Sequence, residues 1–145
     1  DRDFSKPMQI FVKDMEELKA TGAMPSPLAE KISAAFCPGP VTIIIPNRSG
    51  GKTGFRVPDH PFILKLMESI DFALSATSAN YSGKPNAMNI EDALSQLDGE
   101  PDIVIDAGQL PEGTMASTVI DVTGETFKIL RPGPVTEAMI NEAVY

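Results

Sequence analysis

Residues 41–57 read VTIIIPNRSGGKTGFRV, and this stretch decides the fold class. Residues 41–45 are all β-branched, which predicts a buried strand. Residues 47–54 contain Gly-Gly, a common turn signal, and residues 55–57 predict a strand that returns beside the first. The segment therefore predicts a hairpin inside a sheet.

Strands and helices alternate along the rest of the chain. Strands are expected at 8–12, 72–76, 103–106, 117–122 and 126–130, and helices at 13–20, 27–36, 61–70, 90–97 and after 136. Ser26, Asn89 and Thr136 are the expected N-caps of three of these helices. Some neighbouring strands are joined by turns too short for a parallel crossover, so the sheet must be mixed. We expect an α/β fold with one domain over residues 1–145.

Composition limits the class of protein. The chain has 145 residues, of which 42% are hydrophobic, enough for one globular domain with a core. No window approaches the ~18 apolar residues of a membrane span, and the start lacks a signal-peptide pattern, so we expect a soluble, cytoplasmic protein. Cys37 and His60 are the only cysteine and histidine, which excludes an internal disulfide and a Cys/His zinc site.

The charge distribution leaves two interpretations open. A net charge of −8 argues against a generally basic surface that binds nucleic acid. All four arginines lie beside turn-forming or Pro/Gly residues, whereas the acidic residues fall on expected helix faces. The arginines, which are Arg2, Arg48, Arg56 and Arg131, either form a local cationic pocket for phosphate and carboxylate or are simply tolerated in loops.

Three motifs have an ordinary structural explanation. Residues 49–54 (SGGKTG) suggest a phosphate-binding loop, but Pro46 stands where its first glycine is needed and a strand follows, so we predict a hairpin turn. Cys37 lies in an apolar context without a partner histidine, which favours a buried structural cysteine. His60 follows Asp59 and could act as a base, but a loop histidine positioned by a turn is the favoured interpretation.

The most informative stretch is TSANYSG, residues 77–83. An expected strand ends here in small hydroxyl and amide side chains, and Gly83 permits close backbone approach, so the loop is either an anion site or a polar turn. Ser117, Thr118 and Arg131 are further polar residues at strand ends. Placed at one edge of the sheet, these residues would complete a phosphate cradle.

These pieces, in this order, resemble the YrdC-like family of threonylcarbamoyl-adenylate synthases. The stretches that carry the resemblance are RDFSKP (2–7), PGPVT (38–42), FRVPDHP (55–61), ATSANYSG (76–83), DAG (106–108), STVID (117–121) and ILRPG (129–133). They cover almost the whole chain in the family's order.

The resemblance implies a twisted mixed parallel and antiparallel sheet, flanked by helices, whose concave cationic face holds ATP and threonine. It assigns Arg2 to the arginine of the family's lysine-x-arginine motif, with Lys6 as the following basic residue, and makes both catalytic. The motif's lysine and the family's N-terminal segment are not in this sequence, so the expected domain is N-terminally incomplete. The residues it assigns to the ATP and substrate site are Thr42, Arg56, Ser78, Asn80, Ser117 and Arg131, with fold stability as the other role open to Arg56.

The implied reaction forms L-threonylcarbamoyl-adenylate from L-threonine, bicarbonate and ATP, releases pyrophosphate, and serves the threonylcarbamoyladenosine modification of tRNA. Positioning and neutralisation of phosphate charge suffice for it, with ATP and Mg²⁺ but no protein metal site. Implied partners are downstream threonylcarbamoyl-transferring proteins and tRNA or double-stranded RNA. Two alternatives are a double-stranded RNA-binding module and the carbamate-adenylating domain of a hydrogenase-maturation carbamoyltransferase.

Overall fold

A computed structural model describes residues 9–145, which fall into two compact units. The sheet unit contains residues 9–76 and 115–145, and the second unit contains residues 77–114. Arg2 and Lys6 lie outside the described residues, so their assignment stays a prediction. A single domain over residues 1–145 likewise stays a prediction.

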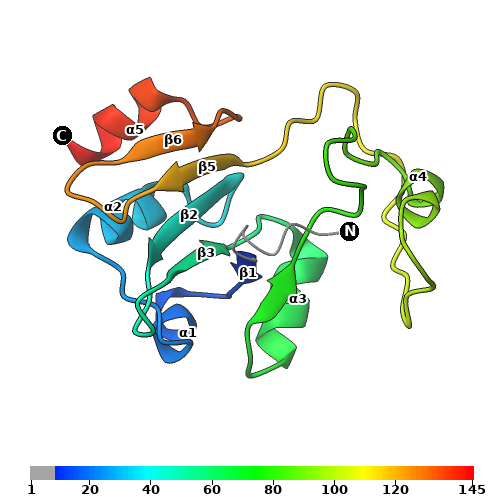
Figure 1. Cartoon of the computed structure of the whole chain (residues 1–145), viewed down its shortest axis with the longest axis horizontal. Helices are drawn as coiled ribbons and strands as arrows, with labels where there is room; N and C mark the ends of the chain where they lie inside the picture. The colour runs from blue at the N-terminus through cyan, green and yellow to red at the C-terminus, as the bar shows by residue number, and fades with distance from the viewer. Residues whose placement is uncertain (1–8) are drawn as a thin grey trace. The chain divides into compact units, whose positions relative to one another are not determined.

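Residues 9–145 contain six strands, which form one sheet in the order β4-β1-β3-β2-β5-β6 (Figure 1). The strands are β1 (Gln9–Phe11), β2 (Val41–Pro46), β3 (Lys52–Arg56), β4 (Leu74–Ala76), β5 (Thr118–Asp121) and β6 (Lys128–Arg131). β1 pairs with β3, and β2 with β5, in parallel, while the other neighbours are antiparallel. The predicted α/β class with a mixed sheet is therefore confirmed.

Five helices accompany the strands in the described part of the chain. They are α1 (Met15–Ala20), α2 (Pro27–Phe36), α3 (Pro61–Ser69), α4 (Ile90–Ser95) and α5 (Glu137–Val144). The predicted caps are confirmed. The side chains of Ser26, Asn89 and Thr136 each accept a hydrogen bond from the backbone nitrogen of the third residue in the helix that follows. None of the described helices has the length and apolar character needed to cross a membrane.

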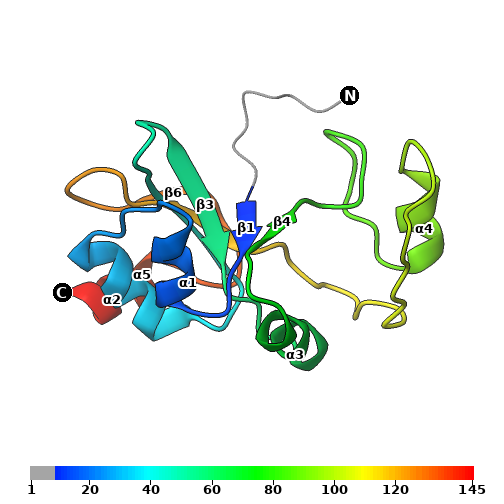
Figure 2. The same cartoon turned by 90° about the horizontal axis from the view of Figure 1, so that it is seen from below.

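One face of the sheet carries the core. Val41, Ile43 and Ile45 alternate along β2, and each is fully buried. They pack with residues of α1, α2, α3 and α5, which lie on this side of the sheet (Figure 2): Leu18, Ala29, Ile32, Leu64, Ile140 and Val144. Thr42 lies between two of the core residues and faces the other side, which no described helix of this unit covers. That second face carries the polar residues discussed below.

Residues 47–51 form the predicted hairpin turn between β2 and β3, and the KTG part of SGGKTG belongs to β3. The backbone nitrogen of Asn47 donates to the Gly51 carbonyl oxygen at 3.0 Å, and the side-chain Oδ1 of Asn47 accepts from the Gly51 nitrogen at 2.9 Å. Gly50 has φ of +83°, a conformation that favours glycine. Because this turn closes so tightly, β3 begins at Lys52, three residues before the expected start.

The prediction of a strand at residues 103–106 is wrong. Ile103, Val104 and Ile105 are 79%, 46% and 55% exposed, and none of residues 77–114 forms a strand. β-branched residues favour a strand only where a neighbouring strand and a packing surface are available, and their own unit supplies neither. The other differences are shifts of element ends: the fourth helix ends at Ser95 and β4 begins at Leu74, whereas β2 and β6 extend to Pro46 and Arg131.

The Lys52–Asp121 ion pair crosses β2 from β3 to β5. Lys52 Nζ lies 2.8 Å from Asp121 Oδ2, and Asp121 Oδ1 accepts hydrogen bonds from the nitrogen and hydroxyl of Thr123 at 2.9 and 2.6 Å. Burial raises the pKa of the Asp121 carboxyl, but the bonds from Lys52 and Thr123 and the charge of Lys52 outweigh it, so the net pKa lies below its ordinary value.

We predict that Asp121→Asn lowers the free energy of unfolding at pH 7 by about 0.5–1 kcal/mol, the value of a partly exposed ion pair. Because the carboxyl pKa is lower in the folded state, this stabilisation is present above about pH 4 and is lost as the pH falls through the folded value. Urea unfolding at a series of pH values measures this stabilisation. Lys52→Met, which removes the other partner of the ion pair and leaves the carboxyl in place, is the matched control. An equal difference at pH 7 and at about pH 2 would contradict this linkage.

Candidate functional site: an arginine and hydroxyl cluster at one end of the sheet

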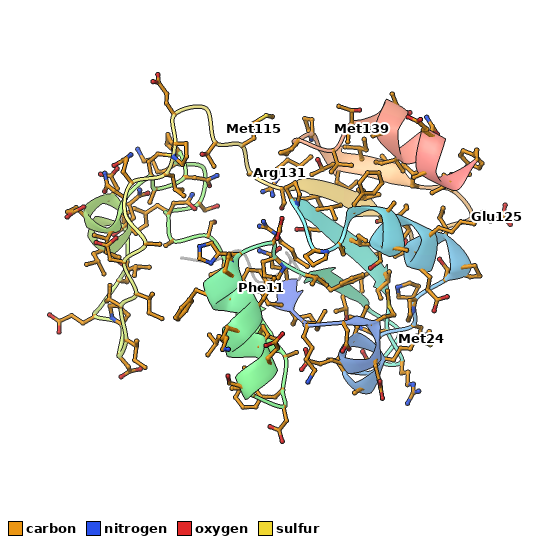
Figure 3. All side chains as sticks on the ribbon, turned by 180° about the vertical axis from the view of Figure 1, so that it is seen from behind. Phe11, Met24, Met115, Glu125, Arg131 and Met139 are labelled. Carbon is orange, nitrogen blue, oxygen red and sulfur yellow. The ribbon has the colours of Figure 1, made fainter. Side chains whose placement is uncertain are left out.

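Four of the predicted site residues meet at one end of the sheet. The parallel strands β2 and β5 begin there, and their antiparallel neighbours β3 and β6 end there. Thr42 and Ser117 therefore come from strand beginnings, and Arg56 and Arg131 from strand ends. Figure 3 shows Arg131 at the opposite end of the β5–β6 hairpin from Glu125. We call Gln9, Thr42, Arg56, Ser117 and Arg131 the site cluster.

Arg131 is fastened along one edge of its guanidinium group. Nε and Nη2 donate to the Ser117 carbonyl oxygen at 3.1 and 2.8 Å, and Nη2 also donates to Ser117 Oγ at 3.0 Å. These bonds fix the plane of the group. Nη1 has no hydrogen-bond partner within residues 9–145, so this edge remains available to an anionic ligand.

Arg56 is held by a single hydrogen bond, in which its Nε donates to the Gly39 carbonyl oxygen at 3.2 Å. Burial lowers the pKa of its guanidinium; Cys37 acts in the opposite direction, and the positive charge of Arg131 lowers the pKa further. The group remains protonated at neutral pH. The two arginines therefore repel each other, and an anion bound near both relieves this repulsion.

A row of hydrogen-bonded side chains extends from Arg131 across the sheet. Ser117 Oγ lies 2.9 Å from Thr42 Oγ1, which donates to Gln9 Oε1 at 3.1 Å. Because the Thr42 proton goes to Gln9, Ser117 must donate to Thr42 while it accepts from Arg131. Thr42 and Ser117 are only 4% and 6% exposed, so the row holds their hydroxyls in one orientation.

Gln9 is the site residue that sequence reasoning missed. The apolar run at residues 8–12 predicts a buried strand and no more. Gln9 is its single polar side chain, and this is the one signal in the sequence that could have indicated a site residue here. Its pairing with Thr42 depends on strand register, which the sequence pattern does not reveal.

Ser78 and Asn80 belong to the second unit and lie two and four residues after the end of β4 at Ala76. Asn80 Nδ2 donates to the carbonyls of Tyr81 and Lys84 at 3.1 and 2.9 Å, so the side chain holds its own loop together. Its Oδ1 is buried and has no hydrogen-bond partner in the described part of the chain. Ser78 is exposed. A meeting of these two residues with the site cluster stays a prediction.

Cys37 and His60 share no hydrogen bond in the described part of the chain. Cys37 is half-buried, and burial raises the pKa of its thiol although the Ser33 hydroxyl, the Val57 backbone and the Arg56 charge lower it. A raised pKa leaves little thiolate at neutral pH, which agrees with a structural cysteine. His60 is the N-cap residue of α3 and lies in a loop as predicted, but its backbone is extended and residues 57–60 form no turn.

The fold and the site cluster define a class of protein: an α/β domain with two guanidinium groups and a row of hydrogen-bonded hydroxyls at one end of its sheet. A family model described as "Telomere recombination", of the Sua5/YciO/YrdC family, matches residues 1–133. The chain belongs to this family, which confirms the resemblance seen in the sequence.

Relatives and solved structures agree with this assignment. The chain is 32% identical over 141 residues to threonylcarbamoyl-AMP synthase of Pyrococcus abyssi, covering 91% of this chain and 41% of the relative. It is 30% identical over 154 residues to threonylcarbamoyl-AMP synthase of Bacillus subtilis, covering 99% and 44%. The crystal structure of P. abyssi Sua5 complexed with L-threonine is 30% identical, with a TM-score of 0.85 and coverage of 99% and 44%. The chain thus spans less than half of each of these proteins.

We predict that Cys37 in the native protein reacts with a thiol reagent such as DTNB about tenfold or more slowly than in the urea-unfolded chain at the same pH. Burial and the raised pKa both reduce the accessible thiolate. Because Cys37 is the single cysteine, the absorbance change reports this residue alone. Ser33→Ala should slow the native reaction further, since the Ser33 hydroxyl lowers the Cys37 pKa. Equal native and unfolded rates would identify an activated thiol instead.

Proposed function

We propose that this chain takes part in the ATP-dependent formation of L-threonylcarbamoyl-adenylate from L-threonine, bicarbonate and ATP, for threonylcarbamoyladenosine modification of tRNA. The main support is the pair Arg56 and Arg131, which are fastened to backbone carbonyls at one end of the sheet and carry positive charge that an anion would neutralise. The names of the Pyrococcus and Bacillus relatives support the reaction, and the Sua5 complex with L-threonine supports the amino acid.

The proposed chemistry needs no covalent intermediate on the protein. The threonine amine and bicarbonate combine to a carbamate with loss of water. A carbamate oxygen then attacks the α-phosphorus of ATP, the bond to the β-phosphate oxygen breaks, and pyrophosphate leaves with the electron pair. Positioning of the two reactants and stabilisation of phosphate charge are the tasks left to the protein.

The site cluster has groups suited to these tasks. Arg131 and Arg56 offer charge-assisted donors to phosphate or carboxylate oxygens. Ser117 and Thr42, whose protons are committed within the row, offer lone pairs to a donor on the ligand. We assign Ser78 and Asn80 to the ATP contacts, and Arg2 and Lys6 to the catalytic basic residues, as the family resemblance implies.

Mg²⁺ enters this proposal as part of the MgATP substrate. Residues 9–145 contain no group of three His, Cys, Asp or Glu side chains that could hold a metal ion. Mg²⁺ in nucleotide sites is commonly held by substrate phosphates with few protein ligands and several waters, so this set of residues fits a metal that arrives with ATP.

The proposed product is an activated threonylcarbamoyl group, which a threonylcarbamoyl-transferring protein must deliver to tRNA in the cytoplasm. A net charge of −8 disfavours duplex RNA as the primary ligand, because counterion release requires many phosphate contacts from basic residues.

We predict that Arg131→Ala weakens ATP binding by about 1.5–3 kcal/mol, on the order of 10- to 100-fold in Kd, the value of a charge-assisted contact. Calorimetric titration with MgATP measures the change. Arg48→Ala is the matched control, since Arg48 lies in the β2–β3 turn at the other end of β2 from Thr42. Unchanged affinity in a variant with a normal melting curve would remove Arg131 from the site.

We also predict that pyrophosphate release from ATP requires both L-threonine and bicarbonate, since only their carbamate supplies the attacking oxygen. The Bacillus subtilis relative serves as the positive control in the same assay. Release that is independent of threonine would support carbamate adenylation instead. Background release together with tight, steeply salt-dependent binding of duplex RNA would support the RNA-binding module.

A further inference from the structure

We propose that Thr118 is a positioning residue that aims Arg131 at its ligand by clamping the turn that follows Arg131. The proposal rests on the proposed function for the identity of that ligand, ATP. Thr118 is completely buried and therefore does not touch a bound ligand itself. Its influence must pass through the segments that it holds.

The hydroxyl of Thr118 makes two hydrogen bonds across the sequence Arg131-Pro-Gly-Pro-Val135. Thr118 Oγ1 donates to the Val135 carbonyl oxygen at 2.9 Å and accepts from the Val135 nitrogen at 3.0 Å. Both bonds are buried, so water cannot replace them. One side chain of β5 therefore fixes the far end of the turn whose near end carries Arg131.

Gly133 brings the middle of the turn against the same residue. A Cβ atom on Gly133 would lie 2.5 Å from the Thr118 nitrogen, 2.7 Å from the Ala116 carbonyl oxygen and 2.8 Å from Thr118 Oγ1. Its φ is not positive, so the need for glycine here is one of space. The turn thus lies directly on the beginning of β5.

Thr118 also connects the anchors of the two arginines. Its chain neighbour Ser117 supplies the carbonyl and hydroxyl that hold Arg131. The backbone nitrogen of Thr118 donates to the Pro40 carbonyl oxygen at 2.9 Å. Gly39, which precedes Pro40, accepts the hydrogen bond that holds Arg56. The side-chain hydroxyl serves only the Arg131 turn, whereas the backbone serves both anchors. Removal of the hydroxyl should therefore disturb Arg131 and spare Arg56.

A double-mutant cycle separates positioning from general stability. Thr118→Val keeps the shape and removes both hydrogen bonds, Thr118→Ser keeps the hydroxyl, and each is combined with Arg131→Ala. We expect Thr118→Val to weaken MgATP binding on the order of tenfold when Arg131 is present and by less than about twofold when it is alanine. Thr118→Ser should bind MgATP with nearly the affinity of the parent protein. An equal loss in both backgrounds, or no loss, overturns the proposal.

A second measurement needs no ligand. In NMR spectra of the arginine Nε–H groups, Arg131 should be protected from solvent exchange by the Ser117 carbonyl. Thr118→Val should speed this exchange, whereas Arg56 should keep its protection by Gly39. Unchanged Arg131 exchange overturns the proposal. If the parent does not bind ATP, the proposed function fails while this measurement still decides the role of Thr118. Should Thr118→Val melt below the assay temperature, both experiments are repeated at a temperature at which this variant is folded.

Discussion

The parallel pairing of β2 with β5 is the interaction on which the rest of the site depends. Its register sets Val41 beside Thr118 and Thr42 beside Val119, so the two strands begin at the same end of the sheet. Their antiparallel partners must then end there, which brings Arg56 and Arg131 to the same place. The apolar face of the same strands is buried against the helices and fixes the register, because a shift of one residue would turn the core toward solvent.

The sequence predicted those parts of the fold that depend on local chemistry. The β-branched run at 41–45 and the caps Ser26 and Thr136 are confirmed because backbone preference and tertiary structure agree there. The run at 103–105 has the same chemistry but no partner strand in its unit, so the local preference failed. Gln9 was missed for a related reason: its hydrogen-bond partner Thr42 is 33 residues away, and only the strand order brings them together.

The positive charge of the site cluster is not neutralised within the cluster, because the hydrogen-bond acceptors of its two arginines are uncharged. Arg56 and Arg131 are anchored by the carbonyl oxygens of Gly39 and Ser117, which orient a guanidinium without neutralising it. The chain has 20 acidic residues, yet the described ion pairs of this protein involve lysines only. Two unneutralised cations near each other cost stability in the free protein, and the proposed binding of an anion would recover this cost.

Two identical tripeptides explain how such cations are held in place. Pro38-Gly39-Pro40 precedes β2, and Pro132-Gly133-Pro134 follows β6. Each glycine lacks room for a Cβ, Gly39 against the Phe36 carbonyl and Gly133 against the beginning of β5, and neither has a positive φ. The flanking prolines restrict the backbone and donate no hydrogen bond. The backbone of each turn is therefore restricted before any ligand arrives, so the proposed binding of an anion to the nearby arginine would cost little further entropy.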